Sequence, residues 1–578
     1  MRTRVESCGA HPAQSADRAG KKKPSSVLWI AASIFPLAVE GSQGLILGPH
    51  MCKSPVALIK VCEEIMNTCI RNAAPRYAKK RSKVGALARC LPGAALLLIV
   101  TSTAALAEPI SVYPPNPHYF QYKGKPVLLI SSDHHYGAII DRDFDFVKFL
   151  NYMAEHGMNL TRIYPGGYFE VPDEFIKNNP LGPLPGRQIL PWAKSTEAGA
   201  HPDLAEAGQP SYKFDLDKWN PEYFDRLKAF VTLAHQKDII VEVAFFNAMY
   251  EVSWPVMPLY HGNNINNVGN YEQKDWPLFT TVDPRNADVI KRQQAYVAKI
   301  TRELNGYDNV IYDICDEPKL HKQTDAQVVP WIVAMKDAFL GAEKDLPKKH
   351  LLGQTVRGAA SPTLSSESWN LWLPTEYITY AEEALAEDYV WNKPIVVVET
   401  AWYGALDIGN GYKDVNSVRL ETWEFMVGGG AGHINLNGEY YRGQETGGDD
   451  THNGIIPQKK VLRDFLTSFD FVLMSRLTDF TAPKDAIVST MAENGKQYAL
   501  YIFHGWLKNH SFWVGTPGDY QDEIALNTIP AGTYRLEWID PATGAVKHTE
   551  TRTHVGAKLV LKTPAYSMDL ALRMRRSM

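Results

Sequence analysis

The sequence predicts a protein of the α/β class, a (β/α)8 barrel followed by a small antiparallel β-sandwich. Between about residues 108 and 480, short apolar runs alternate with amphipathic stretches, which is typical of βα units. Two of these runs, at 309–318 and 394–402, are rich in β-branched residues, as expected for strands buried on both faces. Beyond about residue 481 only short alternating runs remain. We therefore expect the barrel at 108–480 and the sandwich at 481–578.

Eight apolar runs supply the strands that such a barrel requires. They lie at 126–132, 158–164, 239–246, 310–317, 350–355, 368–373, 394–399 and 428–436, of which the sixth and eighth are weak patterns by themselves. Amphipathic stretches at 144–156, 219–237 and 286–304 predict helices between strands. The long segments 166–212 and 247–283 predict loops, and loops of this length are usually functional or disordered.

The C-terminal segment shows strand patterns without evident chemistry. Runs at 497–504, 532–539 and 558–562 predict strands, and the Asp-Pro-Ala-Thr-Gly turn at 540–544 separates two of them. The sequence contains no internal repeat, phosphate-binding loop or metal-spaced His/Cys cluster. We therefore expect neither a metal nor another cofactor.

The net charge of −4 combines a basic N-terminal segment with an acidic remainder. Residues 1–107 carry 15 Lys and Arg against 5 Asp and Glu, whereas residues 108–578 carry 45 against 59. An acidic body argues against nucleic acid as a partner, because that affinity depends on basic contacts to phosphate. Of the cysteines, only Cys315 lies after residue 107, so we expect no internal disulfide there and a buried cysteine at a strand end.

Residues 76–107 have the organisation of a secretory signal peptide. A charged segment at 76–81 precedes a short apolar core at 91–100, and Ala-Leu-Ala at 105–107 matches a cleavage site. The core is too short for a confident membrane span, so no stable membrane insertion is expected. The part before residue 76 would then reflect a start codon assigned too far upstream. An N-terminus anchored through residues 27–39 is the alternative.

We expect the mature protein to begin at Glu108 and to be secreted or periplasmic, because the signal peptide would be removed after Ala107. N-terminal sequencing of the exported protein checks this. A mature chain that retains residues 27–39 would contradict it.

Glu317 and Glu399 end two of the predicted strands and are the candidate catalytic residues. In a (β/α)8 barrel the C-terminal ends of the strands carry the chemistry. Two carboxylates at one pocket are what cleavage of a glycosidic bond requires, one as acid and one as nucleophile or base. A single strand-end glutamate could equally cap a helix or pair with an arginine, but two at matching positions favour a catalytic role.

The barrel resembles the clan A glycoside hydrolases of the cellulase (family 5) type. The resemblance covers roughly residues 110–575 and rests on the opening GKPVLLISSDHHYG, on Asp316-Glu317-Pro318 and on Glu399. It is particularly similar to secreted bacterial barrels with a C-terminal β-sandwich of the collagen-binding-like kind. The resemblance implies Glu317 as general acid/base, Glu399 as nucleophile, Arg162 as support for the nucleophile, and a retaining mechanism with carboxyl groups about 5–5.5 Å apart.

The chain departs from the family at two positions. Asp316 stands where the family has an asparagine that contacts the sugar 2-hydroxyl, and Trp372 stands near the usual strand-six His or Tyr. Other strand ends carry candidate sugar-binding side chains, since aromatic rings cover sugar C–H faces and His donates directional hydrogen bonds. The candidate substrate-binding residues are His134, Arg162, Tyr164, Asp316, Trp402 and His433. For each alone, core packing is an equally good interpretation.

We therefore expect a secreted retaining glycoside hydrolase that acts on poly- or oligosaccharide through two glutamates. An exo-acting pentofuranosidase on the same barrel is one alternative. A barrel that has lost catalysis and only binds carbohydrate is the other, favoured by Asp316 and Trp372 and opposed by the intact Glu317 and Glu399. The sequence does not identify the sugar, the linkage, the site of cleavage (chain end or chain interior) or the oligomeric state.

Overall fold

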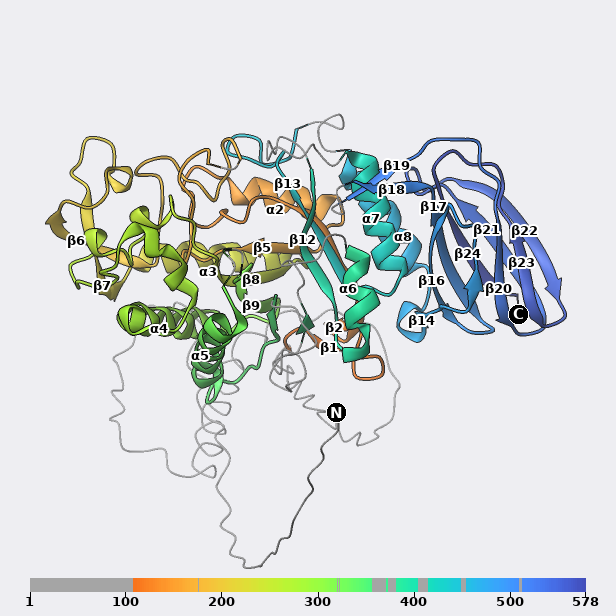
Figure 1. The fold of residues 1–578 in the computed structure, drawn as a ribbon, viewed down its shortest axis with the longest axis horizontal. Helices are drawn as coiled ribbons and strands as arrows, with labels where there is room; N and C mark the ends of the chain where they lie inside the picture. The colour runs from red at the N-terminus through yellow and green to blue at the C-terminus, as the bar shows by residue number, and fades with distance from the viewer. Residues whose placement is uncertain are drawn as a thin grey trace, which may run out of the picture. The chain divides into compact units, whose positions relative to one another are not determined.

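The computed structural model describes residues 108–174, 176–319, 321, 323–355, 371–372, 381–403, 414–448, 454–508 and 512–577. Residues Thr101–Met578 form one compact unit. Parallel strands with helices outside them fill the N-terminal part of this unit, and antiparallel sheets fill the C-terminal part (Figure 1).

Eight parallel strands occur at the expected places in the chain. They are β4 (Leu129–Asp133), β5 (Leu160–Ile163), β8 (Ile240–Asn247), β9 (Val310–Asp316), β10 (Leu352–Gln354), β11 (Leu371–Trp372), β12 (Val396–Tyr403) and β13 (Gly432–Asn437). Hydrogen bonds join them in the orders β11-β10-β9-β8-β5 and β12-β13-β4. The Asn159 side chain links β4 to β5, because it donates to Leu128 O at 2.8 Å and accepts from Ile130 N at 2.9 Å.

This is the strand order of a (β/α)8 barrel. In the described residues no strand ladder joins β4 to β5 or β11 to β12, so a closed ring is not shown. Of the sixth predicted strand, 368–373, Leu371–Trp372 lie within the described residues and form β11.

The three predicted amphipathic stretches form helices whose bounds agree to within two residues: α2 (Phe146–Glu155), α3 (Pro221–Gln236) and α4 (Ala287–Leu304). The described residues also form α5 (Asp325–Glu343), α6 (Ala381–Asp388), α7 (Val415–Val427) and α8 (Ile455–Thr467), which were not predicted. Asp145 caps α2 by accepting from two backbone N–H groups, and Asn220 caps α3 ahead of a proline at its first position. No described helix has the length and apolar character needed to cross a membrane.

The side chains that point into the interior of the parallel sheets form layers. An apolar cluster includes Leu160, Ile240 and Ile311, and the short N-terminal strands pack against it. Those strands are β1 (Ser111–Val112), β2 (Phe120–Tyr122) and β3 (Lys125–Val127). Side chains on one face of a strand recur every second residue. Two residues further along the same three strands stand Arg162, Glu242 and Asp313, so a charged layer lies above an apolar floor.

The segments expected to be loops contain more structure than the sequence indicated. Within 166–212 and just beyond it, β6 (Trp192–Ala198) pairs antiparallel with β7 (Tyr212–Trp219). The sequence WAKSTEA of β6 lacks apolar alternation because most of this strand is exposed or half-buried. Short 3-10 helices also occur in the two segments: η2 (Pro202–Leu204), η3 (Trp254–Val256), η4 (His261–Asn263) and η5 (Gln273–Thr280). Others lie elsewhere in the described chain: η6 (Pro284–Asn286), η7 (Tyr389–Trp391) and η8 (Phe471–Leu473).

The C-terminal part consists of antiparallel sheets. A six-stranded sheet has the order β14 (Ser475–Arg476), β16 (Ile487–Glu493), β17 (Gln497–Phe503), β24 (Asp569–Arg576), β21 (Gly532–Ile539) and β22 (Val546–His554). A three-stranded sheet has the order β15 (Phe480–Thr481), β20 (Glu523–Ile529) and β23 (Ala557–Lys562), and β18 (Gly505–Lys508) pairs with β19 (Phe512–Gly515). Residues of the first two sheets share one apolar cluster, and the strands begin at Ser475, before the expected boundary.

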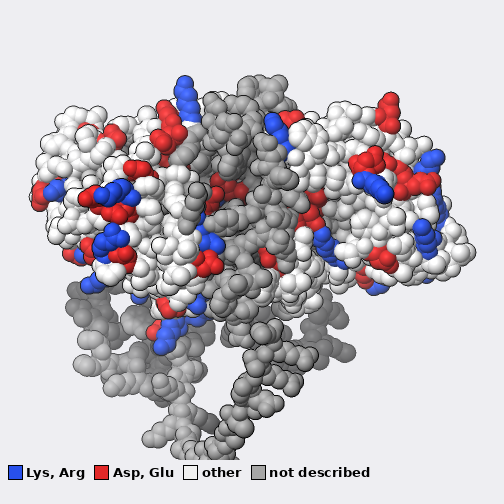
Figure 2. Space-filling view, in the orientation of Figure 1, with Lys and Arg blue, Asp and Glu red and all other residues white. Residues whose placement is uncertain are grey.

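Helix α7 connects these sheets to the parallel strands. Arg419 Nε donates to Asp569 Oδ2 at 2.8 Å, and Trp513 Nε1 donates to Glu424 Oε2 at 2.6 Å. The Trp423 ring stacks on Tyr501 with centroids 5.3 Å apart. Over the face in Figure 2, basic and acidic side chains of the described residues are interspersed on both parts.

Candidate active site

Arg162 lies at the centre of four carboxylates inside the parallel strands. Its Nε is 3.0 Å from Glu242 Oε1, and its Nη2 is 3.2 Å from Asp313 Oδ2. Its Nη1 is 3.1 Å from Asp316 Oδ2 and 3.3 Å from Glu399 Oε2. The side chains of Arg162, Glu242 and Asp313 have no exposed surface, whereas Glu399 keeps 14%. We call this group the Arg162 cluster.

Two tyrosines hold the guanidinium of Arg162 and one of its acidic partners. The rings of Tyr136 and Tyr164 lie 5.0 and 5.3 Å from the guanidinium carbon, within range of cation–π attraction. The Tyr164 hydroxyl donates to Asp316 Oδ2, and the Tyr136 hydroxyl donates to Val398 O beside Glu399. The position of Arg162 is therefore fixed by packing as well as by charge.

One guanidinium cannot neutralise four buried carboxylates, so part of the Arg162 cluster must hold protons. Burial raises the pKa of Glu242 to about 7, although Arg162 opposes the rise. Burial also raises the pKa of Asp313 well above its usual range. Both side chains lie on the inner side of Arg162, away from the strand ends. When Glu242 and Asp313 are protonated they are neutral, so the positive charge of Arg162 then stabilises Asp316 and Glu399.

Glu399 is the carboxylate of the cluster that solvent reaches. Burial, followed by the charges of Asp316 and Glu317, raises its pKa well above the usual range, and Arg162 opposes the rise. A hydrogen bond between the Asp316 and Glu399 side chains acts in the same direction. The two side chains thus share a proton as pH falls, and Glu399 becomes fully ionised only above its raised pKa.

Glu317 follows β9 directly and has an unusual backbone conformation. Its φ is 45°, in the left-handed region that residues other than glycine seldom adopt. Such strain occurs preferentially at functional sites, where the surrounding structure imposes it. Glu317 is half-buried and its charge acts on Glu399, so both predicted catalytic residues lie at the same C-terminal end of the strands.

Asp133 and His134 support this arrangement from β4. Asp133 accepts from Thr161 Oγ1 at 3.1 Å and from the backbone N–H of Arg162. His134 Nδ1 lies 2.7 Å from Asp133 Oδ1, and its Nε2 accepts from Ala138 N at 3.1 Å. Both ring nitrogens of the buried His134 are therefore engaged within the fold, and its role in binding substrate stays a prediction.

The other predicted binding residues differ in where they lie. Tyr164 and Asp316 belong to the Arg162 cluster and its surroundings. His433 is fully buried, with Nδ1 3.2 Å from Lys459 Nζ on α8 and its ring near Phe425 on α7, so it faces the helices. The side chains of Trp402 and Trp372 are outside the described residues, although their backbones belong to β12 and β11, and their roles stay predictions.

Sequence reasoning missed Glu242 and Asp313. Their signal is an acidic residue within an otherwise apolar run, Glu242 in IIVEVAFF and Asp313 in VIYDIC. A charge in such a run is buried and must be paired, which indicates a polar site inside the sheet. Cys315, also in β9, is buried as expected. Among the described residues, no group of three or more His, Cys, Asp or Glu is placed to hold a metal ion.

Replacing Asp316 with asparagine is expected to shift the acidic limb of the pH–rate profile to lower pH. The change removes a negative charge that raises the pKa of Glu399, so Glu399 ionises at lower pH. The profile of kcat/KM between pH 4 and 9 checks this. Asp225→Asn, which changes an exposed residue of α3, serves as the matched control.

An unchanged acidic limb in Asp316→Asn would show that the contact with Asp316 does not control the ionisation of Glu399. A second expectation follows from the sequence, in which Asp316 directly precedes Glu317. If the charge of Asp316 raises the pKa of Glu317, Asp316→Asn would move the basic limb to lower pH. That expectation stays a prediction, and the same profile tests it.

Comparison with solved structures supports the fold. A glycoside hydrolase aligns with a TM-score of 0.52 at 13% identity over 81% of this chain and 97% of its own. A Bacteroides vulgatus protein assigned to the glycoside hydrolases aligns with a TM-score of 0.53 at 12% identity over 82% and 83%. A family 5 glycoside hydrolase from the same organism gives 0.50 at 13% over 81% and 93%. No family model and no curated protein sequence matches the chain.

Proposed function

We propose that this protein is a retaining glycoside hydrolase that cleaves O-glycosidic bonds in neutral or mixed poly- or oligosaccharides. The observation that carries the proposal is the placement of Glu399 against Arg162 and Asp316, at the same strand ends as the strained Glu317. The fold shared with glycoside hydrolases, which include a family 5 member, supports it. Export through the signal peptide expected at residues 76–107 belongs to the same proposal.

Each glutamate has a role in a double displacement. Ionised Glu399 attacks the anomeric carbon while protonated Glu317 gives its proton to the departing glycosidic oxygen, so one C–O bond forms as another breaks. Glu317, now ionised, takes a proton from water, and that water displaces Glu399 from the sugar. Arg162 orients Glu399 and stabilises its ionised form, which the surrounding carboxylates disfavour.

Glu317→Ala is expected to slow the cleavage of substrates with poor leaving groups by about 10²–10⁴-fold, because their oxygen needs a proton in the transition state. Substrates with an activated leaving group, such as 2,4-dinitrophenyl glycosides, should retain much of the rate of the first step. Azide should restore turnover by attacking the glycosyl-enzyme without help from a base.

The experiment uses the mature protein on a panel of polysaccharides and aryl glycosides, followed by Glu317→Ala on the best substrate with and without azide. Glu174→Gln, on an exposed residue, is the control. Equal losses for good and poor leaving groups, with no azide product, would remove Glu317 from the acid/base role.

One observation favours the alternative of a barrel that only binds carbohydrate. The pKa of Glu399 is raised, so at low pH this side chain is protonated and cannot act as a nucleophile. A binding protein would retain polysaccharide affinity and show no turnover at any pH. Turnover that appears as pH rises would support the hydrolase instead.

A further inference from the structure

His135 and Glu170 form a second pair of polar side chains next to the candidate active site. His135 Nε2 lies 3.1 Å from Glu170 Oε1, and the Tyr168 hydroxyl donates to the same oxygen at 3.4 Å. The Glu170 side chain is 3% exposed and that of His135 11%. Neither residue belongs to the Arg162 cluster, and the mechanism above does not use them.

The pair lies at the same end of the strands as Glu317 and Glu399. His135 follows β4, Glu170 lies in the segment after β5, and Tyr250 follows β8. The ring of Tyr168 lies 6.1 Å from Tyr164 and 6.4 Å from Tyr250. Burial and then the charges of Glu317, Glu170 and Glu399 raise the pKa of Tyr250, so its hydroxyl lies within electrostatic range of all three carboxylates.

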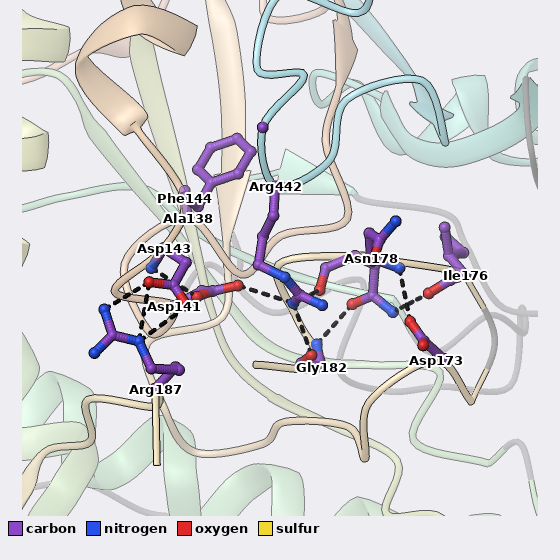
Figure 3. Close-up of polar contacts among 12 residues, drawn as sticks. Ala138, Asp141, Asp143, Phe144, Asp173, Ile176, Asn178, Gly182, Arg187 and Arg442 are labelled. Atoms are coloured by element: carbon purple, nitrogen blue, oxygen red, sulfur yellow. Dashed lines mark hydrogen bonds and ion pairs between the residues drawn. The ribbon is translucent and has the colours of Figure 1, made fainter. Parts of the chain in front are cut away.

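Polar contacts fix the segment that carries Glu170. Its backbone N–H donates to Leu181 O, and Gly182 N–H donates to the Asn179 side chain. Arg442, from the segment after β13, donates to Asp141 Oδ2 at 3.0 Å and to the carbonyls of Asn179 and Gly182 (Figure 3). Three segments that follow different strands are thereby held together, so Glu170 has a defined position before any ligand arrives.

Both members of the pair keep an unused polar atom. His135 Nδ1 and Glu170 Oε2 are buried and have no hydrogen-bond partner among the described residues. Burying a polar atom without a hydrogen-bond partner is unfavourable, so a ligand hydroxyl that supplies the missing partner gains free energy. Tyr250, His321 and Trp276 provide half-buried rings nearby, with Tyr250–His321 and His321–Trp276 centroids 5.3 and 5.6 Å apart.

We propose that His135 and Glu170 bind adjacent hydroxyl groups of a neutral sugar unit beside the scissile bond, and that Glu170 excludes uronic acids from this position. The inference rests on the proposed function of Glu317 and Glu399. Glu170 Oε2 accepts from one hydroxyl, His135 Nδ1 bonds the next one, and the aromatic rings cover the C–H face of the sugar.

The exclusion of uronic acids follows from the charges around the position. A sugar carboxylate there would meet Glu170, Glu317 and Glu399, and like charges in a partly buried site repel strongly. Arg162 already contacts four carboxylates, and Lys319 Nζ is paired with Asp325 at 2.8 Å. Neither described cation is therefore left to compensate a charged sugar.

The test measures binding by isothermal titration calorimetry in the full chain carrying Glu399→Gln, so that no turnover interferes. The probes are cellohexaose, mannohexaose and xylohexaose as neutral sugars, and hexagalacturonate as the uronic acid. Glu170→Gln keeps the shape of the side chain and removes its charge. Glu174→Gln removes a charge from an exposed residue of the same segment and is the matched control.

We expect at least one neutral hexasaccharide to bind and hexagalacturonate to bind far more weakly. Adding Glu170→Gln should weaken the neutral ligand about tenfold, the range for a hydrogen bond to a charged group, and should strengthen hexagalacturonate. A merely structural role would weaken both ligands. Tyr168→Phe removes one hydrogen bond to Glu170 but leaves its charge, so it should weaken the neutral ligand less than Glu170→Gln does and should leave hexagalacturonate binding weak.

Unchanged affinities in Glu170→Gln, equal losses for both ligands, a preference for hexagalacturonate, or no binding of any neutral probe would overturn the inference. Failure of the proposed function is a separate result, because it would appear as turnover that survives Glu399→Gln.

Discussion

Glu399→Gln is expected to lower kcat at least about a thousandfold, because the amide cannot form the glycosyl-enzyme and loss of a nucleophile costs this much or more in comparable systems. Steady-state rates on the best substrate of the panel measure the loss. Glutamine keeps the shape of the side chain and can still contact Arg162 Nη1, 3.3 Å away in the native protein, so folding should be preserved.

Labelling gives independent evidence on the nucleophile. A 2-deoxy-2-fluoro glycoside of the same sugar, with an activated leaving group, should attach to wild-type protein at the peptide that contains Glu399. Glu174→Gln should be labelled like wild type, and Glu399→Gln should not be labelled. A variant that keeps more than about a thousandth of the wild-type rate, or a label on another carboxylate, would remove Glu399 from the role of nucleophile.

Arg162→Met is expected to destabilise the protein by about 3–5 kcal/mol at pH 7, the usual cost of removing one partner of a buried ion pair. Methionine fills much of the space but leaves Glu242, Asp313, Asp316 and Glu399 without their counter-ion. Urea denaturation monitored by tryptophan fluorescence measures the difference. Arg187→Met, at an exposed arginine paired with Asp143, should change stability little.

The loss in Arg162→Met should become smaller as pH falls. A carboxylate whose folded pKa is raised disfavours folding when it is ionised. This unfavourable contribution begins to fall as pH drops through the folded pKa and disappears only below the lower pKa of the unfolded chain. Because the pKa of Glu242 is about 7 even beside Arg162, the recovery should begin near neutral pH. A variant as stable as Arg187→Met, or a loss independent of pH, would show that the cluster is not held by Arg162.

Regular segments were predictable because their patterns are local. The strands β9 and β12 are β-branched runs between turns. Helices α2 and α3 carry N-caps, and α2, α3 and α4 each have an apolar face that indicates a helix. By contrast, β22 (VKHTETRTH) is polar because most of its residues are exposed or half-buried, and nothing in its composition distinguishes it from a loop.

The site was predictable only in part, because the sequence does not show where the side chains after each strand point or which distant segments they contact. The sequence places His134 and His135 together just after β4, but in the structure His134 points into the core and His135 points to Glu170. Glu170 lies in a segment that the sequence shows only as a long loop. Its partner His135 and the contacts of Arg442 come from segments distant in the chain, so no local pattern could reveal them.

The contacts of α7 limit how this protein could have been assembled from parts. Many secreted enzymes gain or lose accessory modules because linkers isolate them from the catalytic domain. Here Arg419 of α7 donates to Asp569, and Glu424 of α7 accepts from Trp513. The Trp423 ring stacks on Tyr501. Recombination that exchanged the C-terminal sheets would leave a buried arginine and glutamate unmatched. The two parts are therefore expected to be inherited together and to be completed only once the end of the chain has been synthesised.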